Sequence, residues 1–148
     1  MSTWQDYLVD DDAALARILR ESRTIAVLGA TNDRSRPAYY VPAYLKSSGY
    51  LVQGVNPILE GEEVFGEPVV ATLADLAQPV DVIDVFRRPA FLPGHATEIL
   101  ALPWKPAVVW FQLGIRNDAA ARRLAEAGIQ VVQDRCMMPD HRRLLGAA

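Results

Sequence analysis

A continuous apolar run, Thr24-Ile25-Ala26-Val27-Leu28, is followed directly by Gly29. The run is short and aliphatic, which is typical of a strand buried on both faces. A glycine at the end of such a strand is typical of the tight turn that leads toward a helix. We therefore expect residues 24–28 to form the first strand of a parallel sheet.

Apolar runs and helical segments alternate along the rest of the chain. Further strands are predicted at residues 51–55, 69–70, 80–85, 107–111 and 129–133. Helices are predicted at residues 13–20, 39–48, 72–76, 89–102 and 117–127, with a last helical turn at 140–145. This alternation predicts parallel pairing with right-handed crossovers. The predicted fold is α/β: a doubly wound parallel sheet, Rossmann-like, in three α/β/α layers, with strand order 3-2-1-4-5-6.

Three details depend on proline, glycine and acidic residues. Pro42 is expected in the first turn of its helix or at a kink, because it lacks a backbone N–H. Pro93-Gly94 is expected to interrupt the helix over residues 89–102. Residues 58–67 are polar and rich in acid and glycine, so we expect a loop there.

The composition predicts one soluble domain. The chain has 148 residues, 51% hydrophobic and 22% charged, which suits one domain over residues 1–148 with residues 1–22 as an N-terminal helix packed on it. The net charge of −3 argues against a broad nucleic-acid-binding face. With one cysteine, no secretory signal and no apolar run long enough for a bilayer, we expect a cytoplasmic protein that does not bind membranes.

Cationic side chains gather in the loops that follow the predicted strands. Ligands of doubly wound sheets bind at the carboxyl ends of the strands, where guanidinium groups and helix N-termini suit phosphate oxygens. Any one of these arginines is most simply a solvated loop charge, but the set favours an anionic ligand. Four glutamates between residues 60 and 67 oppose this on one side. The set is Arg34, Arg36, Arg87, Arg88, Arg116 and Arg135.

The first of these loops is not a dinucleotide fingerprint. Reading from Gly29, the sequence G-A-T-N-D-R has only the first glycine of G-x-G-x-x-G, and Thr31 occupies the place of the second. The second predicted strand ends in Val55-Asn56-Pro57, without the acid that binds the ribose of NAD. Both departures disfavour an NAD(P)-binding protein. Asn56 either presents its amide to a ligand or only caps its own turn.

Catalytic residues are scarce. Arg135 could lower the pKa of the neighbouring Cys136, but a packed or idle thiol is favoured. His95 and His141 are too far apart in the sequence to predict a zinc site with this cysteine. We predict no catalytic residue and no metal, although whether the chain is an enzyme stays open.

Asp84 and three aromatic residues near strand ends each allow two interpretations. Asp84, near the end of a predicted strand, either bonds the ligand or pairs with Arg87 or Arg88. Phe86, Trp110 and Phe111 line an adenine slot or belong to the core, and the core is the commoner place for aromatic residues at strand ends.

The ordered set of strand ends resembles a known family, the stand-alone CoA-binding domain proteins. These are related to the nucleotide-binding domain of the succinyl-CoA synthetase α subunit. The resemblance covers residues 24–141. Its matching pieces are residues 25–30 with Arg36-Pro37, residues 55–57, 82–88 and 109–115, and residues 134–136 with His141.

The resemblance implies coenzyme A as cofactor and a set of binding residues. Ala30 stands where family members commonly have serine, so a hydroxyl contact is expected to be missing there. By position, the set is Gly29, Ala30, Arg36 and Pro37 at the phosphates or the near end of the cofactor, Asn56 and Pro57 beside the adenosine, Phe86 and Arg87 over the pyrophosphate or base, and Gln112, Gly114 and Ile115 along the pantetheine arm.

The resemblance implies a binding protein for CoA or an acyl-CoA, acting at the C-terminal edge of the sheet as a non-catalytic carrier, sensor or regulatory module. The phosphohistidine domain of the synthetase has no counterpart in residues 24–141, so thioester synthesis by this chain alone is not expected. An enzyme that acts on CoA thioesters, with a partner subunit or through Cys136, remains the alternative. A protein partner or a homo-oligomer is also left open.

Overall fold

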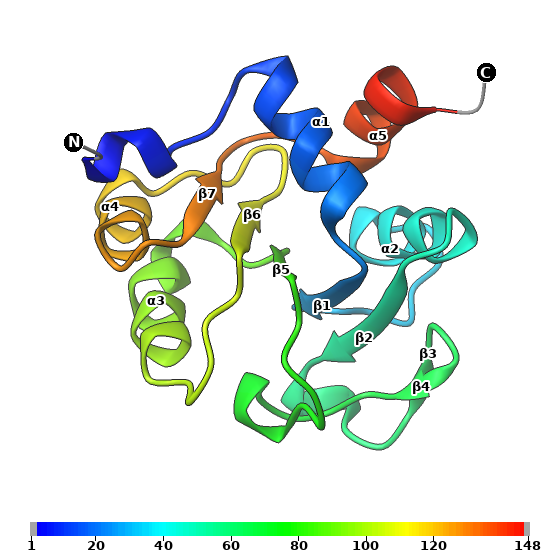
Figure 1. Ribbon diagram of the computed structural model, residues 1–148. Helices are drawn as coiled ribbons and strands as arrows, with labels where there is room; N and C mark the ends of the chain where they lie inside the picture. The colour runs from blue at the N-terminus through cyan, green and yellow to red at the C-terminus, as the bar shows by residue number, and fades with distance from the viewer. Residues whose placement is uncertain (1–2, 147–148) are drawn as a thin grey trace.

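The structure, a computed structural model, describes residues 3–146. Its centre is a five-stranded parallel sheet of order β2-β1-β5-β6-β7, with helices on both faces (Figure 1). The sheet strands are β1 (Thr24–Leu28), β2 (Leu51–Val55), β5 (Val82–Val85), β6 (Val108–Phe111) and β7 (Gln130–Val132). The helices are α1 (Asp12–Glu21), α2 (Pro37–Ser47), α3 (Leu92–Leu100), α4 (Asp118–Glu126) and α5 (Met137–Leu145). The predicted doubly wound α/β fold is confirmed.

Alternate residues of each strand face opposite helical layers. On β1, Ile25 and Val27 pack into one core with residues of α1, α2 and α5, whereas Ala26 and Leu28 pack into a second core with residues of α3 and α4. Every residue of β5 is buried, including the acidic Asp84. The strands are therefore covered on both faces, as their continuous apolar sequences predict.

The predicted third strand is wrong in extent. In place of a strand over residues 69–70, Val70 forms a single parallel bridge with Val55 at the edge of β2. The loop predicted over residues 58–67 is also only partly correct, because it contains a small antiparallel pair, β3 (Glu63–Val64) and β4 (Glu67–Pro68). That pairing uses the residues just before Val69, so little of this segment is left to join the parallel sheet. The other predicted strands follow the expected order.

The helix predictions differ from the structure at α2, α3 and α5. Helix α2 begins at Pro37, which has the backbone angle of a first helical residue, so Pro42 lies beyond the first turn. Helix α3 is continuous from Leu92, because Pro93 falls in the first turn, where no helical hydrogen bond is lost, and Gly94 continues the helix. The last helix, α5, begins three residues earlier than predicted.

The N-terminal segment packs against two helices, since the short 3-10 turn η1 (Trp4–Tyr7) contacts α4 and α1 contacts α5. The guanidinium carbon of Arg122 on α4 is 4.5 Å from the centre of a Trp4 ring. Asp11 caps α1 by accepting a hydrogen bond from the Ala14 N–H. Residues 1 and 148, the ends of the predicted domain, lie outside the described residues. Within residues 3–146, no helix is both long enough and apolar enough to cross a membrane.

Candidate functional site

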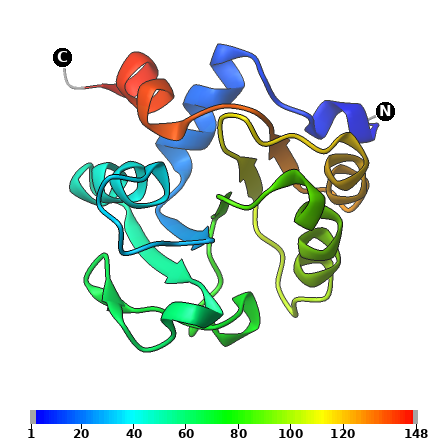
Figure 2. The same cartoon turned by 180° about the vertical axis from the view of Figure 1, so that it is seen from behind.

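A cleft of about 850 Å³ lies at the carboxyl ends of the sheet strands. Five loops contribute to it, those after β1, β2, β5, β6 and β7, and the loop after β1 crosses the front of the molecule in Figure 2. Its lining residues are Gly29, Ala30, Thr31, Arg36, Pro37, Ala38, Tyr40, Asn56, Phe86, Arg87, Arg88, Pro89, Phe91, Gln112, Leu113, Gly114, Ile115 and Cys136.

The structure brings together ten of the eleven binding residues implied by the family resemblance. The exception is Pro57, which begins the short turn η2 (Pro57–Leu59) and does not line the cleft. These residues come from sequence positions as far apart as Gly29 and Ile115. Parallel strands end at one edge of the sheet, and this explains why the loops meet.

Gly29 allows the first loop to pack tightly against the loop after β5. Its φ is +89°, and a Cβ atom there would lie 2.6 Å from the Phe86 carbonyl oxygen. Its own N–H donates to the Val55 carbonyl oxygen at 3.0 Å. Gly29 therefore joins three strand ends and forms part of the floor of the cleft.

The N-terminus of α2 faces the cleft. Arg36 precedes the first helical residue, Pro37, and both line the cleft together with Ala38. The loop before them is held by Asp33, whose carboxylate accepts from the N–H and hydroxyl of Ser35 at 3.0 and 2.7 Å. An eleven-residue helix presents its positive end here, which favours an anionic group.

Three of the six loop arginines reach the cleft, and three do not. Arg36, Arg87 and Arg88 line it. The prediction was wrong for the remaining three as cleft residues, because each has another partner. Arg34 lies 5.6 Å from the centre of the Tyr39 ring, Arg116 pairs with Asp118 at 3.1 Å, and Arg135 forms two hydrogen bonds with Asp140 at 2.7 and 3.0 Å.

The Asn56 amide connects two of the loops. Its Nδ2 donates to the Ala30 carbonyl oxygen at 2.8 Å, and its Oδ1 accepts from the Ile58 N–H at 2.9 Å. Of the two alternatives drawn from the sequence, the capped turn is thus present. Asn56 also lines the cleft, so its first contribution is to hold the Ala30 backbone in place beside it.

Asp84 is a buried acid behind the cleft, and its pKa is raised. Its side chain is fully buried, and burial raises its pKa to about 8, although a hydrogen bond from Gln112 acts in the opposite direction. Neither predicted partner, Arg87 or Arg88, is bonded to it. The Gln112 Nε2 donates to Asp84 Oδ1, while Asp84 Oδ2 and Gln112 Oε1 have no partner among the described residues.

The Cys136 thiol lies on the cleft wall just before α5. Burial is the main cause that raises its pKa, and the nearby Asp84 and Asp140 act in the same direction. Of the two alternatives drawn from the sequence, the raised pKa agrees with the favoured one, a packed or idle thiol, and Asp140 binds the Arg135 guanidinium that could have lowered the pKa. The thiol is therefore protonated at neutral pH and is a weak nucleophile.

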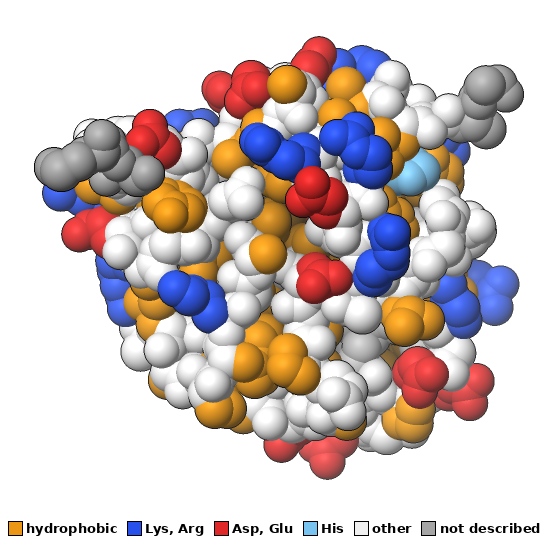
Figure 3. All heavy atoms as spheres, viewed as in Figure 1, with side chains coloured by type: hydrophobic (Ala, Val, Ile, Leu, Met, Phe, Trp, Pro, Cys, Tyr) orange, Lys and Arg blue, Asp and Glu red, His pale blue; other side chains and the backbone are white. Residues whose placement is uncertain are grey.

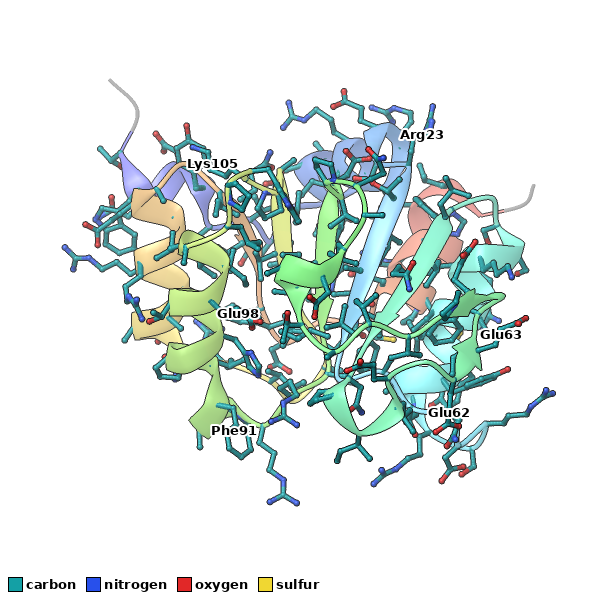
Figure 4. All side chains as sticks on the ribbon, turned by 90° about the horizontal axis from the view of Figure 1, so that it is seen from below. Arg23, Glu62, Glu63, Phe91, Glu98 and Lys105 are labelled. Atoms are coloured by element: carbon teal, nitrogen blue, oxygen red, sulfur yellow. The ribbon has the colours of Figure 1, made fainter. Side chains whose placement is uncertain are left out.

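Exposed apolar residues at the cleft were not identified from the sequence. Tyr40, Phe91 and Leu113 line it and are 42%, 47% and 70% exposed. A sequence pattern places large apolar residues in the core, and only their position in strand-end loops could have indicated otherwise. In Figure 4, Phe91 and Glu62 mark the cleft edge of the molecule, opposite Arg23 and Lys105. Glu62, which directly precedes β3, accepts a hydrogen bond from Asn32 in the loop after β1 at 3.1 Å, so a carboxylate lies at this edge.

The remaining candidates divide between the core and the surface. Trp110 and Phe111 are core residues, while Phe86 lines the cleft. His141 packs against Tyr44, with 2.8 Å between the Tyr44 hydroxyl and His141 Nδ1, and does not line the cleft.

No group of three metal-binding side chains occurs in residues 3–146. The opposite face, seen in Figure 3, mixes basic, acidic and apolar side chains.

A doubly wound parallel sheet with a cleft at the carboxyl ends of its strands defines a Rossmann-like α/β protein. Comparison of the sequence with protein families gives a more specific result. The chain belongs to the CoA-binding domain family, whose sequence profile, described as "CoA binding domain", matches residues 23–142. The resemblance drawn from the strand ends is confirmed.

Relatives from bacteria and archaea extend over most of the chain. The uncharacterized protein YneT of Bacillus subtilis (strain 168) is 34% identical over 129 residues, 87% of this chain and 93% of that protein. The structure of cell-free ID.343 from Thermus thermophilus is 53% identical, with a TM-score of 0.86, and covers 91% of this chain and 99% of its own. A hypothetical protein from Pyrococcus horikoshii OT3 is 34% identical, with a TM-score of 0.85 and coverage of 93% and 94%.

Proposed function

We propose that this protein binds coenzyme A, or an acyl-CoA, in the cleft, and serves as a non-catalytic carrier, sensor or regulatory module. Membership in the CoA-binding domain family supports CoA as the ligand. One observation carries the choice of site. Arg36, Arg87 and Arg88 line the cleft together with the N-terminus of α2, and the other residues that line it are uncharged.

The distribution of charge suits the two parts of CoA. Guanidinium forks and helix N–H groups bind phosphate oxygens, and they lie at the loops after β1 and β5. The pantetheine arm is neutral, and the wall formed by Gln112, Gly114, Ile115 and Cys136 is neutral as well. The volume of about 850 Å³ falls within the range of about 300–1,000 Å³ that is usual for small-molecule sites.

This charge pattern supports an orientation for the ligand. Gly29, Ala30, Arg36 and Pro37 are placed to contact phosphate groups, and Phe86 and Arg87 line the cleft beside Gly29. Asn56 would border the adenosine part. Pro57 does not line the cleft and would contribute only by fixing the turn that begins after Asn56. The arm would run past Gln112 toward the Cys136 side.

The state of the cleft groups supports a binding role over catalysis. A cysteine nucleophile reacts as the thiolate, and burial raises the pKa of the Cys136 thiol. Among the described residues, no histidine forms a hydrogen bond with that thiol that could take its proton. An enzyme acting through Cys136 would need a change in this environment on binding, and a partner subunit is one way to supply it.

Isothermal titration calorimetry with CoA, acetyl-CoA and NAD tests the proposal. CoA should bind and NAD should not, because the cleft has Thr31 in place of the second fingerprint glycine. Arg36→Ala and Arg87→Ala should each weaken CoA binding by about 1–3 kcal/mol, roughly 5- to 150-fold in Kd. Arg116→Ala is the matched control, because it removes an arginine that pairs with Asp118 outside the cleft lining. Equal losses in all three variants, or no CoA binding, would count against the site.

A further inference from the structure

We infer that His95 and Glu98 are positioning residues that hold the Arg87 guanidinium ready for a phosphate group of the ligand. This inference rests on the proposed function. Neither residue lines the cleft, and both belong to α3. They act on the ligand only through Arg87.

The three side chains form a chain of hydrogen bonds. The Arg87 Nε donates to His95 Nε2 at 3.2 Å, and 3.1 Å separates His95 Nδ1 from Glu98 Oε1. An imidazole nitrogen that accepts a hydrogen bond carries no proton, so the ring proton must lie on Nδ1. There it donates to the Glu98 carboxylate. Glu98 thereby selects the tautomer of His95 that can receive Arg87.

Helix α3 places these groups in the required order. His95 and Glu98 are three residues apart, so their side chains lie on the same flank of the helix. In Figure 4, Glu98 is labelled beside α3, and Phe91 lies nearer the cleft edge. The His95 and Glu98 side chains are both partly buried, with exposures of 21% for His95 and 30% for Glu98. Partial burial strengthens the hydrogen bond that fixes the ring.

Arg87 is also held by packing. Its Cζ lies 4.6 Å from the centre of the Phe91 ring, which places the guanidinium over an aromatic face. Its Cδ would be 3.1 Å from a Cβ at Gly29, so the arm crosses that glycine closely. Among residues 3–146 the Nε is bonded to His95, and neither Nη atom has a hydrogen-bond partner. The two Nη groups are therefore left for a ligand.

A fixed guanidinium binds an anion better than a mobile one. A free arginine side chain loses rotamer freedom when it contacts a ligand, and this loss opposes binding. Here the loss has already occurred on folding. Arg88 and Arg36, which are exposed, have no hydrogen bond of this kind from their side chains among the described residues.

Calorimetric titration of four variants with CoA tests this inference. His95→Leu removes the acceptor at similar size and should weaken CoA binding roughly tenfold. His95→Gln retains an acceptor oxygen and should recover most of that loss. Glu98→Gln should produce a smaller loss, because the ring is then less firmly oriented. Thr97→Ala is the control on the same helix, since Thr97 bonds to Arg123 and not to Arg87, and it should leave the affinity unchanged.

A double-mutant cycle separates positioning from general damage to α3. In the Arg87→Ala background, His95→Leu should have no further effect on the affinity, because both changes remove the same contact. Thermal unfolding of each variant shows that it is folded. Equal losses from His95→Leu in both backgrounds would overturn the inference, and so would wild-type affinity in His95→Leu. Either result leaves the proposed function standing if Arg87→Ala still weakens CoA binding. If the wild-type protein does not bind CoA, the proposed function itself fails.

Discussion

Asp84 should make the stability of this protein depend strongly on pH. Its carboxyl is fully buried, and its pKa is about 8 in the folded chain against 3.8 for an exposed aspartate. Between these two values the folded protein binds a proton that the unfolded chain has released. The contribution of Asp84 to stability is therefore complete below a pH of about 4 and is lost as the pH rises toward about 8.

The substitution Asp84→Asn isolates this effect. The asparagine carbonyl can still accept the hydrogen bond from Gln112, but the side chain does not ionise. Each pKa unit corresponds to about 1.4 kcal/mol, so the free energy of unfolding of the wild type should fall by about 1.4 kcal/mol per pH unit relative to the variant. Summed from 3.8 to neutral pH, the difference amounts to about 4 kcal/mol in favour of the variant.

Urea unfolding of both proteins at several pH values between about 5 and 8 measures the difference. Any difference in packing or hydrogen bonding between the two side chains adds an offset that does not depend on pH. The test is therefore the slope of the difference in free energy of unfolding against pH. Asp10→Asn, which removes an exposed carboxylate, corrects for the change in total charge. A difference that stays constant across this range would contradict the prediction and would mean that Asp84 is ionised in the folded protein.

Two further predictions concern the cleft: the close packing at Gly29 and the reactivity of the Cys136 thiol. Gly29→Ala would place a Cβ at φ +89°, 2.6 Å from the Phe86 carbonyl oxygen. Gly61→Ala is the control, because its φ of +86° is similar but the space around it is open, and it should lower the free energy of unfolding by about 1 kcal/mol. Gly29→Ala should lower the free energy of unfolding by roughly 1–3 kcal/mol more than the control does. Equal losses in urea unfolding would show that the close approach at Gly29 does not matter. Cys136 should react with iodoacetamide more slowly than glutathione does at the same pH, because burial raises the pKa of its thiol, and saturating CoA should slow it further. A rate by mass spectrometry that CoA leaves unchanged would place the ligand away from this wall.

The central strands could be predicted because their sequences allow few other structures. The apolar runs of β1 and β6 are too short for buried helices and end in turn residues, and both are buried strands. The two-residue run Val69-Val70 gave a weaker signal. It follows Pro68, which lacks a donor and pairs with Glu63 in the β3–β4 hairpin, so only one bridge to β2 forms. Such competition between a hairpin and a sheet depends on tertiary contacts.

The cleft could be located from the sequence because parallel strands end at one edge. That rule brings Gly29, Arg87 and Gln112 together without any knowledge of side-chain contacts. The use of each charge could not be predicted in the same way. Arg135 is bonded to Asp140 only because α5 begins at Met137 and turns that acid toward it.

A crystal structure of the protein grown with CoA would show whether the ligand occupies the cleft. We expect phosphate groups against Arg36, the two Nη atoms of Arg87 and the N-terminus of α2, with the neutral arm directed toward Gln112 and Cys136. CoA bound at another surface, or an empty cleft in crystals of a protein that binds CoA in solution, would contradict the proposed site.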